Sequence, residues 1–264
     1  MRTKAVRMYG KNDLRLEEFE LPQMKEDEVL VKVMSDSICM STYKLVAQGK
    51  KHKRAPQNID TNPVIVGHEC SGIIVEVGEK WKNQFRPGQK FSLQPALNYQ
   101  GKLDSPGYSY EFCGGACTYC IMPHEVMELG CLLDYTGESF FEASLGEPMS
   151  CIIGGYHANY HTNKKNYGHA MGTKEDGNIL IMGGCGPMGL GAVSYGLQFE
   201  NKPRRIVVTD ISDDRIQRAR EVISEESAKK RGIELRYVNT AAMEDPIAEL
   251  MAITEGHGLS LIHI

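Results

Sequence analysis

The sequence lacks any apolar run of the roughly 18 to 20 residues that a membrane-crossing helix needs. It also lacks a basic excess: 30 lysines and arginines stand against 34 aspartates and glutamates, so the formal charge is −4. That balance argues against a nucleic-acid partner. The first ten residues, MRTKAVRMYG, hold no apolar segment of the secretory-signal type. We therefore expect a cytoplasmic protein with no membrane and no nucleic-acid partner.

Cysteine is also sparse, with 8 residues in 264, too few for a disulfide framework. The cysteines are therefore expected to be thiols, some of them metal ligands. The remaining composition, 41% hydrophobic and 24% charged, is that of a globular chain. Its length allows two modest domains, each with its own core.

The two halves of the chain show different patterns of apolar residues. The first half has short, turn-separated runs typical of strands, at residues 4–9, 14–19, 29–34, 65–77 and 90–93. An apolar helical pattern follows over residues 139–156. From Asn178 the pattern alternates strand and helix, which is typical of a parallel α/β sheet, with strands at 179–182, 205–209 and 233–239 and helices at 187–199, 213–231 and 243–253. We expect a domain over 1–156, a connecting loop over 157–177 and a second domain over 178–258.

A glycine-rich turn opens the second half. Gly184, Gly186 and Gly189 fit the G-x-G-x-x-G pattern between an expected strand and an expected helix, and Asp210 follows 21 residues after Gly189. This spacing is that of a dinucleotide-binding turn, in which the glycines allow a tight turn and close approach of the pyrophosphate. The helix N-terminus then offers free N–H groups to the phosphates. The expected cofactor-binding residues are Gly184, Gly186, Pro187, Met188, Gly189, Asp210 and Arg215.

The carboxylate of Asp210 predicts the choice of cofactor. It would accept hydrogen bonds from the ribose hydroxyls and repel a 2′-phosphate, so NAD(H) is favoured. Arg204, Arg205 and Arg215 leave NADP(H) possible, although these arginines have an alternative interpretation as solvated charges.

Candidate metal ligands lie in the first half. Cys39, the pair His68-Glu69, and Glu147 together offer a thiolate, an imidazole and carboxylates. Zinc accepts all three ligand types, and catalytic zinc sites keep one position open for water or substrate. Taken singly, each residue has an ordinary structural alternative, such as a buried thiol, a hydrogen-bonded histidine or a surface charge. Their combination upstream of the glycine-rich turn favours one catalytic Zn²⁺.

The same residues carry a family resemblance. Gly67-His68-Glu69, followed by Gly72 and Gly78, resembles the zinc alcohol dehydrogenase signature, and residues 1–258 resemble the medium-chain dehydrogenase superfamily. The segments 36–44, 52–54 and 186–190 are similar to L-sorbose-1-phosphate reductases. The resemblance implies a GroES-like partly open β-barrel followed by a Rossmann doubly wound parallel sheet. It also implies hydride transfer between NAD(P)(H) and a secondary alcohol or ketone of a polyol or sugar phosphate, of the L-sorbose 1-phosphate and D-glucitol 6-phosphate type.

The resemblance also implies roles for single residues. Cys39, His68 and Glu69 match the zinc ligands of the family, and Glu147 matches a carboxylate beside the metal. Ser41 matches the hydroxyl residue that passes the proton of the substrate. The chain departs from many relatives three and five positions after Cys39, because Thr42 and Lys44 stand where those relatives have aspartate and histidine.

Two further groups invite interpretation. Four cysteines at 113, 117, 120 and 131 suggest a structural zinc, but their spacing does not suit a compact tetrahedral site, and Cys117 and Cys120 would point to opposite faces of an expected strand. The basic run Lys50–Arg54 suits either a sugar phosphate or, more commonly, a solvated loop.

Alternatives remain open for the function and for the C-terminal segment. The substrate is alternatively another polyol or a threonine-like alcohol, or the chain is a cofactor-binding protein without turnover. Residues 259–264 match the translation of an adapter used in sequencing libraries and are expected to be a non-native tail on a truncated Rossmann domain. The first strand of that domain would then have an unpaired edge, and this chain would show little or no activity. The complete protein is expected to be a homo-oligomer.

Overall fold

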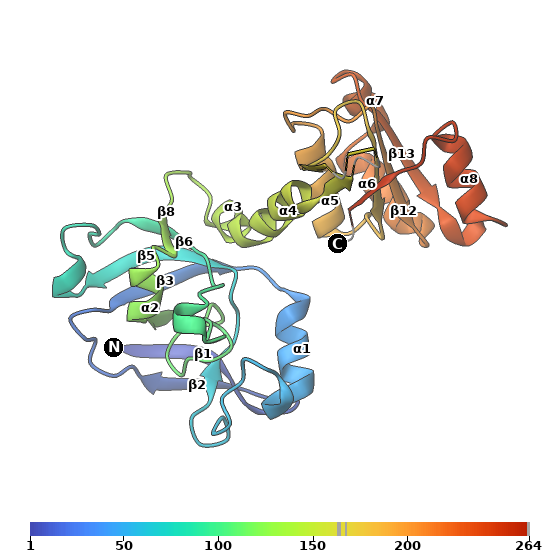
Figure 1. Cartoon of the computed structure of the whole chain (residues 1–264). Helices are drawn as coiled ribbons and strands as arrows, with labels where there is room; N and C mark the ends of the chain where they lie inside the picture. Colours follow the sequence, from blue (N-terminus) through green and yellow to red (C-terminus); the bar gives the residue numbers. More distant parts are fainter. Residues whose placement is uncertain (163–164, 167, 263–264) are drawn as a thin grey trace. The chain divides into compact units, whose positions relative to one another are not determined.

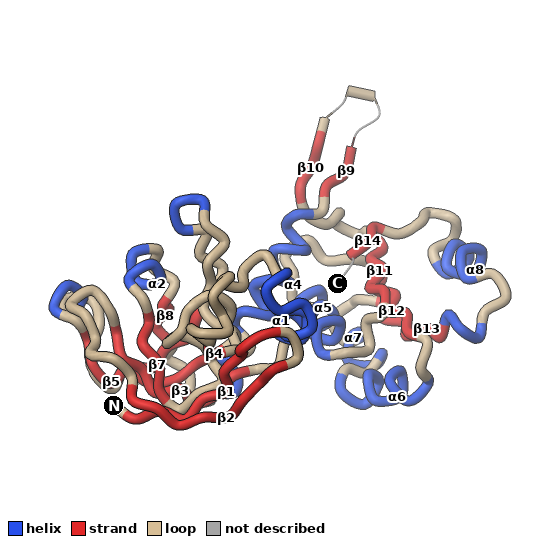
Figure 2. Tube along the Cα trace, turned by 90° about the horizontal axis from the view of Figure 1, so that it is seen from below, coloured by secondary structure: helices blue, strands red, loops and turns tan. Residues whose placement is uncertain are grey.

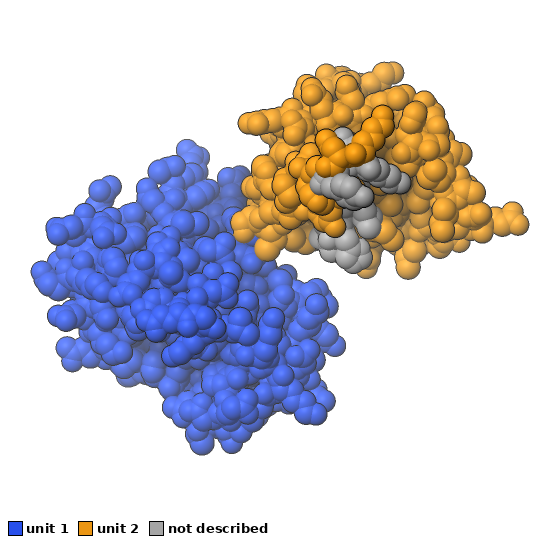
Figure 3. Space-filling model, viewed as in Figure 1, with its two compact units in different colours: residues 1–147 blue, residues 148–264 orange. Residues whose placement is uncertain are grey.

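The computed structural model describes residues 1–162, 165, 166 and 168–262. The chain divides into two compact units, Met1–Glu147 and Pro148–Ile264, which Figure 3 colours separately. Among the described residues, no helix has the length and apolar character needed to cross a bilayer.

The first unit is built mainly of antiparallel strands (Figures 1 and 2). Alternating burial along β1 shows why these runs form strands, since one face packs inward and the other faces solvent. The elements are β1 (Arg2–Gly10), β2 (Asp13–Glu20), β3 (Val29–Asp36), α1 (Met40–Gln48), β4 (Val64–Ile65), β5 (Cys70–Val77), β6 (Lys90–Leu93), β7 (Tyr119–Met122), α2 (His124–Glu128), β8 (Leu132–Asp134) and α3 (Phe140–Ser144).

These strands form two sheets, with strand orders β2-β1-β4 and β7-β3-β5-β6-β8. Among the described residues the two sheets stay separate and do not close into a barrel. A single bridge between Ala5 and Cys117 connects β1 to the segment before β7. Gly72 lets β5 approach β3 closely, because a Cβ there would lie 2.0 Å from the carbonyl oxygen of Lys32. The expected partly open arrangement is confirmed for the described strands. The expected strand over 65–77 is two strands, with Gly67, His68 and Glu69 between them.

The second unit is an α/β structure with a parallel sheet (Figures 1 and 2). Its strand order, β13-β12-β11-β14, is the 3-2-1-4 order of a Rossmann fold. The elements from the division onward are α4 (Gly146–Ala158), β9 (Tyr160–Thr162), β10 (His169–Met171), β11 (Asn178–Met182), α5 (Pro187–Gly196), β12 (Arg205–Asp210), α6 (Asp213–Val222), α7 (Glu225–Lys229), β13 (Glu234–Asn239), α8 (Pro246–Ile253) and β14 (Ser260–Ile262).

Helix α4 explains why the division of the chain comes earlier than the expected boundary. Ile152 and Tyr156 are buried in the core of the second unit. The Tyr156 hydroxyl donates a 2.7 Å hydrogen bond to the carbonyl of Ala192 on α5. After its first turn, α4 therefore packs with the α/β sheet. The sequence placed the boundary at the polar loop after α4, because it does not show which core the helix joins.

Two expected helices are interrupted. The pattern over 139–156 gives α3 and α4, which Leu145 separates as the C-cap of α3. The pattern over 213–231 gives α6 and α7, because the Ser224 side chain accepts a hydrogen bond from the Ser227 amide and starts a new helix. The expected connecting loop contains the β9–β10 hairpin, although residues 163, 164 and 167 lie outside the described residues.

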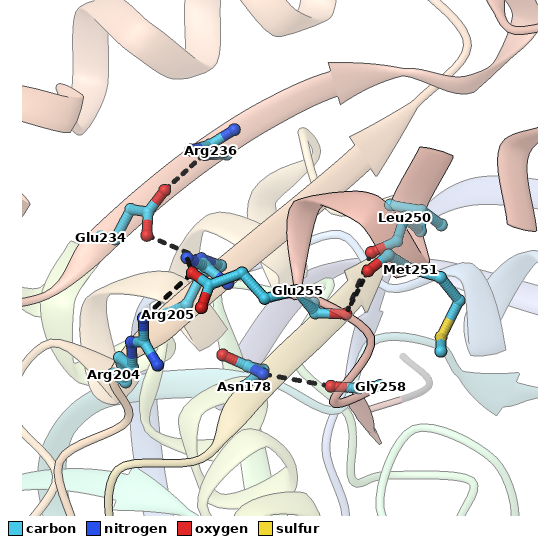
Figure 4. Close-up of polar contacts among 10 residues, drawn as sticks. Asn178, Arg204, Arg205, Glu234, Arg236, Leu250, Met251, Glu255 and Gly258 are labelled. Carbon is cyan, nitrogen blue, oxygen red and sulfur yellow. Dashed lines mark hydrogen bonds and ion pairs between the residues drawn. The ribbon is translucent and has the colours of Figure 1, made fainter. Parts of the chain in front are cut away.

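The expectation of an unpaired edge on the first strand of this sheet was wrong. β14 pairs in parallel with β11, with Ile179 opposite Ser260 and Ile181 opposite Ile262. The chain approaching β14 is held at the start of the sheet (Figure 4): the Asn178 side chain donates to the carbonyl of Gly258 at 3.2 Å. Ser260–Ile262 thus takes the place of the fourth strand, whereas residues 263 and 264 of the expected tail lie outside the described part of the chain.

Candidate metal and dinucleotide sites

The first site joins two segments that are 29 residues apart in the sequence. Cys39 is the N-cap of α1, where its sulfur accepts a 3.4 Å hydrogen bond from the Ser41 amide. His68 and Glu69 directly precede β5. One potential ligand atom from each of Cys39, His68 and Glu69 lies within 4.8 Å of the others. Within the described residues this is the single such group of three or more.

Neighbouring polar groups orient the His68 and Glu69 side chains. The Ser37 hydroxyl donates to Oε2 of Glu69, and the Glu69 amide donates to Oδ1 of Asp36 at 3.1 Å. Oγ1 of Thr42 lies 3.3 Å from Nδ1 of His68. A metal-bound histidine is commonly fixed through its second nitrogen in this manner. Thr42, a departure from the pattern of many relatives, therefore contacts the imidazole.

Burial shifts the pKa values of the side chains at this site. It lowers the pKa of His68 to about 4, with Glu69 opposing that shift, so the imidazole is neutral at pH 7. Burial also raises the pKa of the Cys39 thiol, and the nearby Glu69 adds to the rise. The pKa of Asp36 is raised to about 7, again mainly by burial. A neutral imidazole beside a thiol and a carboxylate suits a divalent cation, which would favour the thiolate electrostatically.

Tyr108 is a site residue that the sequence pattern did not reveal. Its hydroxyl lies 3.2 Å from Nε2 of His68, and the side chain is 2% exposed. Burial raises the pKa of Tyr108 to about 12, whereas Ser41 opposes that rise. Gly107 brings Tyr108 here: its φ is +77°, and a Cβ would lie 2.1 Å from the carbonyl oxygen of Gly67. The glycine before an aromatic residue was the available signal.

The other two predicted residues of this site lie close by. Ser41, in the first turn of α1, is near enough to Tyr108 to lower the pKa of the phenol. Glu147 lies outside the group of three, but its charge raises the pKa of Tyr108. The structure therefore places Cys39, His68 and Glu69 together, with Ser41 and Glu147 around Tyr108.

The second site is the glycine-rich turn between β11 and α5. A Cβ on Gly189 would lie 2.2 Å from the carbonyl oxygen of Gly184, and a Cβ on Gly184 would lie 2.7 Å from Val208. Gly186, the N-cap of α5, faces open space instead. Pro187 and Met188 form the first turn of α5, where the missing N–H of proline costs no hydrogen bond. Two glycines thus allow close packing, and the third leaves room for a ligand.

Asp210 ends β12 beside this turn. Its carboxylate accepts hydrogen bonds from the amides of Cys185 (3.4 Å), Ile211 (2.8 Å) and Ser212 (3.2 Å). Arg215 is exposed in the first turn of α6, and its charge lowers the pKa of Cys185 against the dominant effect of burial. The structure thus places Arg215 and Asp210 near the same turn.

Arg204 and Arg205 do not lie there. They stand at the start of β12, whereas nucleotides bind at the carboxyl ends of parallel strands. Arg205 pairs with Glu234 (2.7 Å) and Glu255 (3.2 Å), and Arg204 pairs with Glu255 (3.0 Å; Figure 4). The alternative interpretation of Arg205 as a solvated charge is wrong, because Arg205 is only 4% exposed.

The cysteines near the barrel interior make other contacts. The Cys113 thiol donates to Sδ of Met122 at 3.6 Å, and Cys120 is buried in the same core. Cys117 precedes β7 rather than lying on it, and its thiol donates to the carbonyl of Gly114. The Cys131 thiol points to the carbonyl of Leu129 at 3.8 Å. The expected common strand for Cys117 and Cys120 is therefore wrong, since the strand starts at Tyr119.

Comparison with known proteins gives the family context. Residues 25–132 match the alcohol dehydrogenase GroES-like domain. The fold matches 2R,3R-butanediol dehydrogenase from Bacillus subtilis, with a TM-score of 0.72 and 24% identity over 96% of this chain and 67% of that one. It also matches an alcohol dehydrogenase from Thermotoga maritima, with a TM-score of 0.70 and 18% identity over 100% of this chain and 71% of that one.

Two relatives act on phosphorylated polyols or sugars by their names. Mannitol-1-phosphate 5-dehydrogenase of Aliivibrio fischeri is 51% identical over 97% of this chain and 60% of its own length. L-sorbose 1-phosphate reductase of Klebsiella pneumoniae is 42% identical over 99% of this chain and 62% of its own length. The chain thus spans about three fifths of the length of these relatives. The expected resemblance to medium-chain zinc-dependent alcohol and polyol dehydrogenases is confirmed, and residues 25–132 are similar to the GroES-like domain of alcohol dehydrogenases.

Proposed function

We propose that the chain carries the zinc site and the dinucleotide turn of an NAD(H)-linked dehydrogenase for polyol or sugar phosphates. The observation that carries the proposal is the approach of Cys39, His68 and Glu69 to within 4.8 Å, with the imidazole neutral. Both relatives named above support the substrate class. The L-sorbose 1-phosphate and D-glucitol 6-phosphate pair is one candidate within it.

The donor set fits one Zn²⁺. Cys39, His68 and Glu69 would hold the ion, and Glu147 would be a further carboxylate near it. When bound, the zinc supplies a Lewis acid that lowers the pKa of a substrate hydroxyl or polarises a ketone. Ser37 and Thr42 hold Glu69 and His68 in place, and the Tyr108 hydroxyl would have to leave Nε2 of His68 for that nitrogen to bind the ion.

Ser41 is the residue we assign to proton transfer. Its hydroxyl lies near Tyr108, two residues after Cys39. During oxidation it would accept the proton of the substrate hydroxyl while it releases its own hydroxyl proton to solvent, and during reduction both transfers would reverse. Because its pKa is raised to about 12, Tyr108 remains protonated at neutral pH and can donate a hydrogen bond.

The glycine-rich turn would bind the cofactor. Gly186 has open space for the pyrophosphate, and the α5 N-terminus, with Pro187 and Met188, faces it. Asp210 would accept hydrogen bonds from the ribose hydroxyls and so favour NAD(H). Its carboxylate already accepts hydrogen bonds from three backbone amides. Arg215 is the positive side chain that would bind NADP(H).

Two measurements test the proposal: zinc content, and turnover of a panel of polyols, polyol phosphates and threonine with NAD and NADP. We expect one zinc per chain and, for turnover measured on a protein that spans the full length of the relatives, the highest kcat/KM with a phosphorylated polyol. A higher kcat/KM for threonine or an unphosphorylated polyol would favour the alternative substrates. Bound NADH without any turnover would favour a cofactor-binding protein. Oligomeric assembly of the complete protein remains a prediction, which its mass in solution would test.

A further inference from the structure

The basic run Lys50–Arg54 does not act as a unit in the structure. Lys50 forms an ion pair with Asp60 at 2.8 Å, and Lys51 and Lys53 are exposed. Arg54 differs from them: its guanidinium carbon lies 5.1 Å from the centre of the Tyr108 ring. Of the four basic side chains of the run that carry a permanent charge, Arg54 is therefore the one placed against the candidate metal site.

Arg54 lacks the anionic partner that a half-buried cation normally has. Its Nε is buried without a hydrogen-bond partner, and no carboxylate within the described part of the chain pairs with it. Leaving such a donor unsatisfied is unfavourable. The positive charge of Arg54 also acts on the neighbouring histidines, because it contributes to lowering the pKa values of both His68 and His52.

The loop that carries Arg54 is fixed from two sides. The Ser109 hydroxyl donates to the carbonyl of Arg54 at 2.8 Å, and the Arg54 amide donates to Nδ1 of His52 at 3.3 Å. The His52 ring is stacked on Tyr108 with an interplanar angle of 16°. The same tyrosine contacts His68, so it connects the arginine to the candidate zinc ligands.

We propose that Arg54, held against Tyr108, binds the phosphate group of the substrate and makes the site specific for phosphorylated polyols over free polyols. A guanidinium fits phosphate through two parallel hydrogen bonds, and Arg54 supplies an unpaired one next to the reacting end of the site. This inference depends on the proposed function, because it assigns the substrate class of the same site.

The test compares Arg54→Met with Lys53→Met, which removes an exposed charge from the neighbouring residue. Binding of mannitol 1-phosphate, mannitol and inorganic phosphate to the full chain is measured by calorimetry, without a need for turnover. We expect Arg54→Met to weaken the binding of mannitol 1-phosphate about 10- to 100-fold, because charge-assisted hydrogen bonds to the phosphate are lost. Mannitol should bind unchanged, and Lys53→Met should change affinity less than about 3-fold.

Arg54→Lys and circular dichroism keep the test valid if Arg54→Met fails to fold. The lysine retains the charge without the planar fork, so it should give an intermediate affinity for mannitol 1-phosphate. If wild type prefers mannitol 1-phosphate and Arg54→Met keeps that preference, the role of Arg54 is refuted while the proposed function stands. If wild type binds mannitol 1-phosphate no better than mannitol, the phosphorylated substrate class itself is refuted.

Discussion

The two candidate sites are built in opposite ways. The dinucleotide turn comes from one short segment, in which Gly184 and Gly189 pack against each other and Gly186 stays open. The metal site draws Cys39, His68 and Tyr108 from three separate segments, joined by side-chain contacts. A contiguous turn depends on backbone space, whereas a dispersed site depends on the polar contacts that orient each side chain. Substitutions should therefore fail differently in the two units.

His68→Ala should have the largest effect and should remain confined to the metal site. It removes one of three ligands, so we expect loss of bound zinc and a fall in kcat/KM of about 1,000-fold or more. The Kd for NADH should change less than about 2-fold, because the turn lies in the other unit. Zinc analysis and NADH fluorescence measure both. Cys131→Ser, outside the group of three, should retain the metal. Equal loss of zinc from His68→Ala and Cys131→Ser would contradict the assignment of His68 as a zinc ligand.

Gly189→Ala tests the backbone-dependent site. The new Cβ would lie 2.2 Å from the carbonyl oxygen of Gly184, so the turn must shift, at a cost of about 1 to 3 kcal/mol in unfolding free energy. NADH binding should fall with it. Gly186→Ala is the matched control: its Cβ meets no atom within 4 Å, so stability should stay near wild type while NADH affinity falls. Denaturation and NADH titration separate the two outcomes. A stable Gly189→Ala chain with normal NADH affinity would contradict this account.

Asp210→Asn should have a smaller and more selective effect. It removes the charge but keeps an amide oxygen for the backbone N–H donors at this turn. We expect the ratio of kcat/KM for NADH over NADPH to fall about 10-fold, since the repulsion of a 2′-phosphate is lost. Arg204→Gln, at the other end of β12, should leave the ratio unchanged. A wild-type preference for NADPH would refute the role of Asp210.

Glu255→Gln should have the smallest effect. Glu255 is exposed, and although Arg204 and Arg205 both contact it, Arg205 retains its pair with Glu234. Glu255 itself is solvent-exposed, and the buried Arg205 keeps a second carboxylate in Glu234, so we expect the thermal midpoint to stay close to that of wild type. A clear drop would show that the contacts before β14 matter more than their exposure suggests.

The sequence allowed both domains, the glycine-rich turn and the three candidate zinc ligands to be predicted, because each leaves a local pattern. It did not reveal Tyr108 or the position of Arg54, since neither has periodicity or spacing of its own. The placement of Tyr108 depends on the close approach of Gly107 to Gly67, and that of Arg54 on its backbone contacts with Ser109 and His52. Nor did the sequence reveal the carboxylates that pair with Arg205, because Glu234 and Glu255 lie far from it in the sequence.

Helix α4 has a consequence for protein engineering. Its first turn carries Glu147, but Ile152 and Tyr156 anchor the rest of the helix in the α/β core. A chimaera that replaces the second unit from the start of α4 onward also replaces Ile152 and Tyr156. These two residues fix the helix that carries Glu147. A junction placed after Ala158 would instead keep Glu147 native but set Ile152 and Tyr156 against a foreign core. The unit of exchange in such designs is the sheet together with α4.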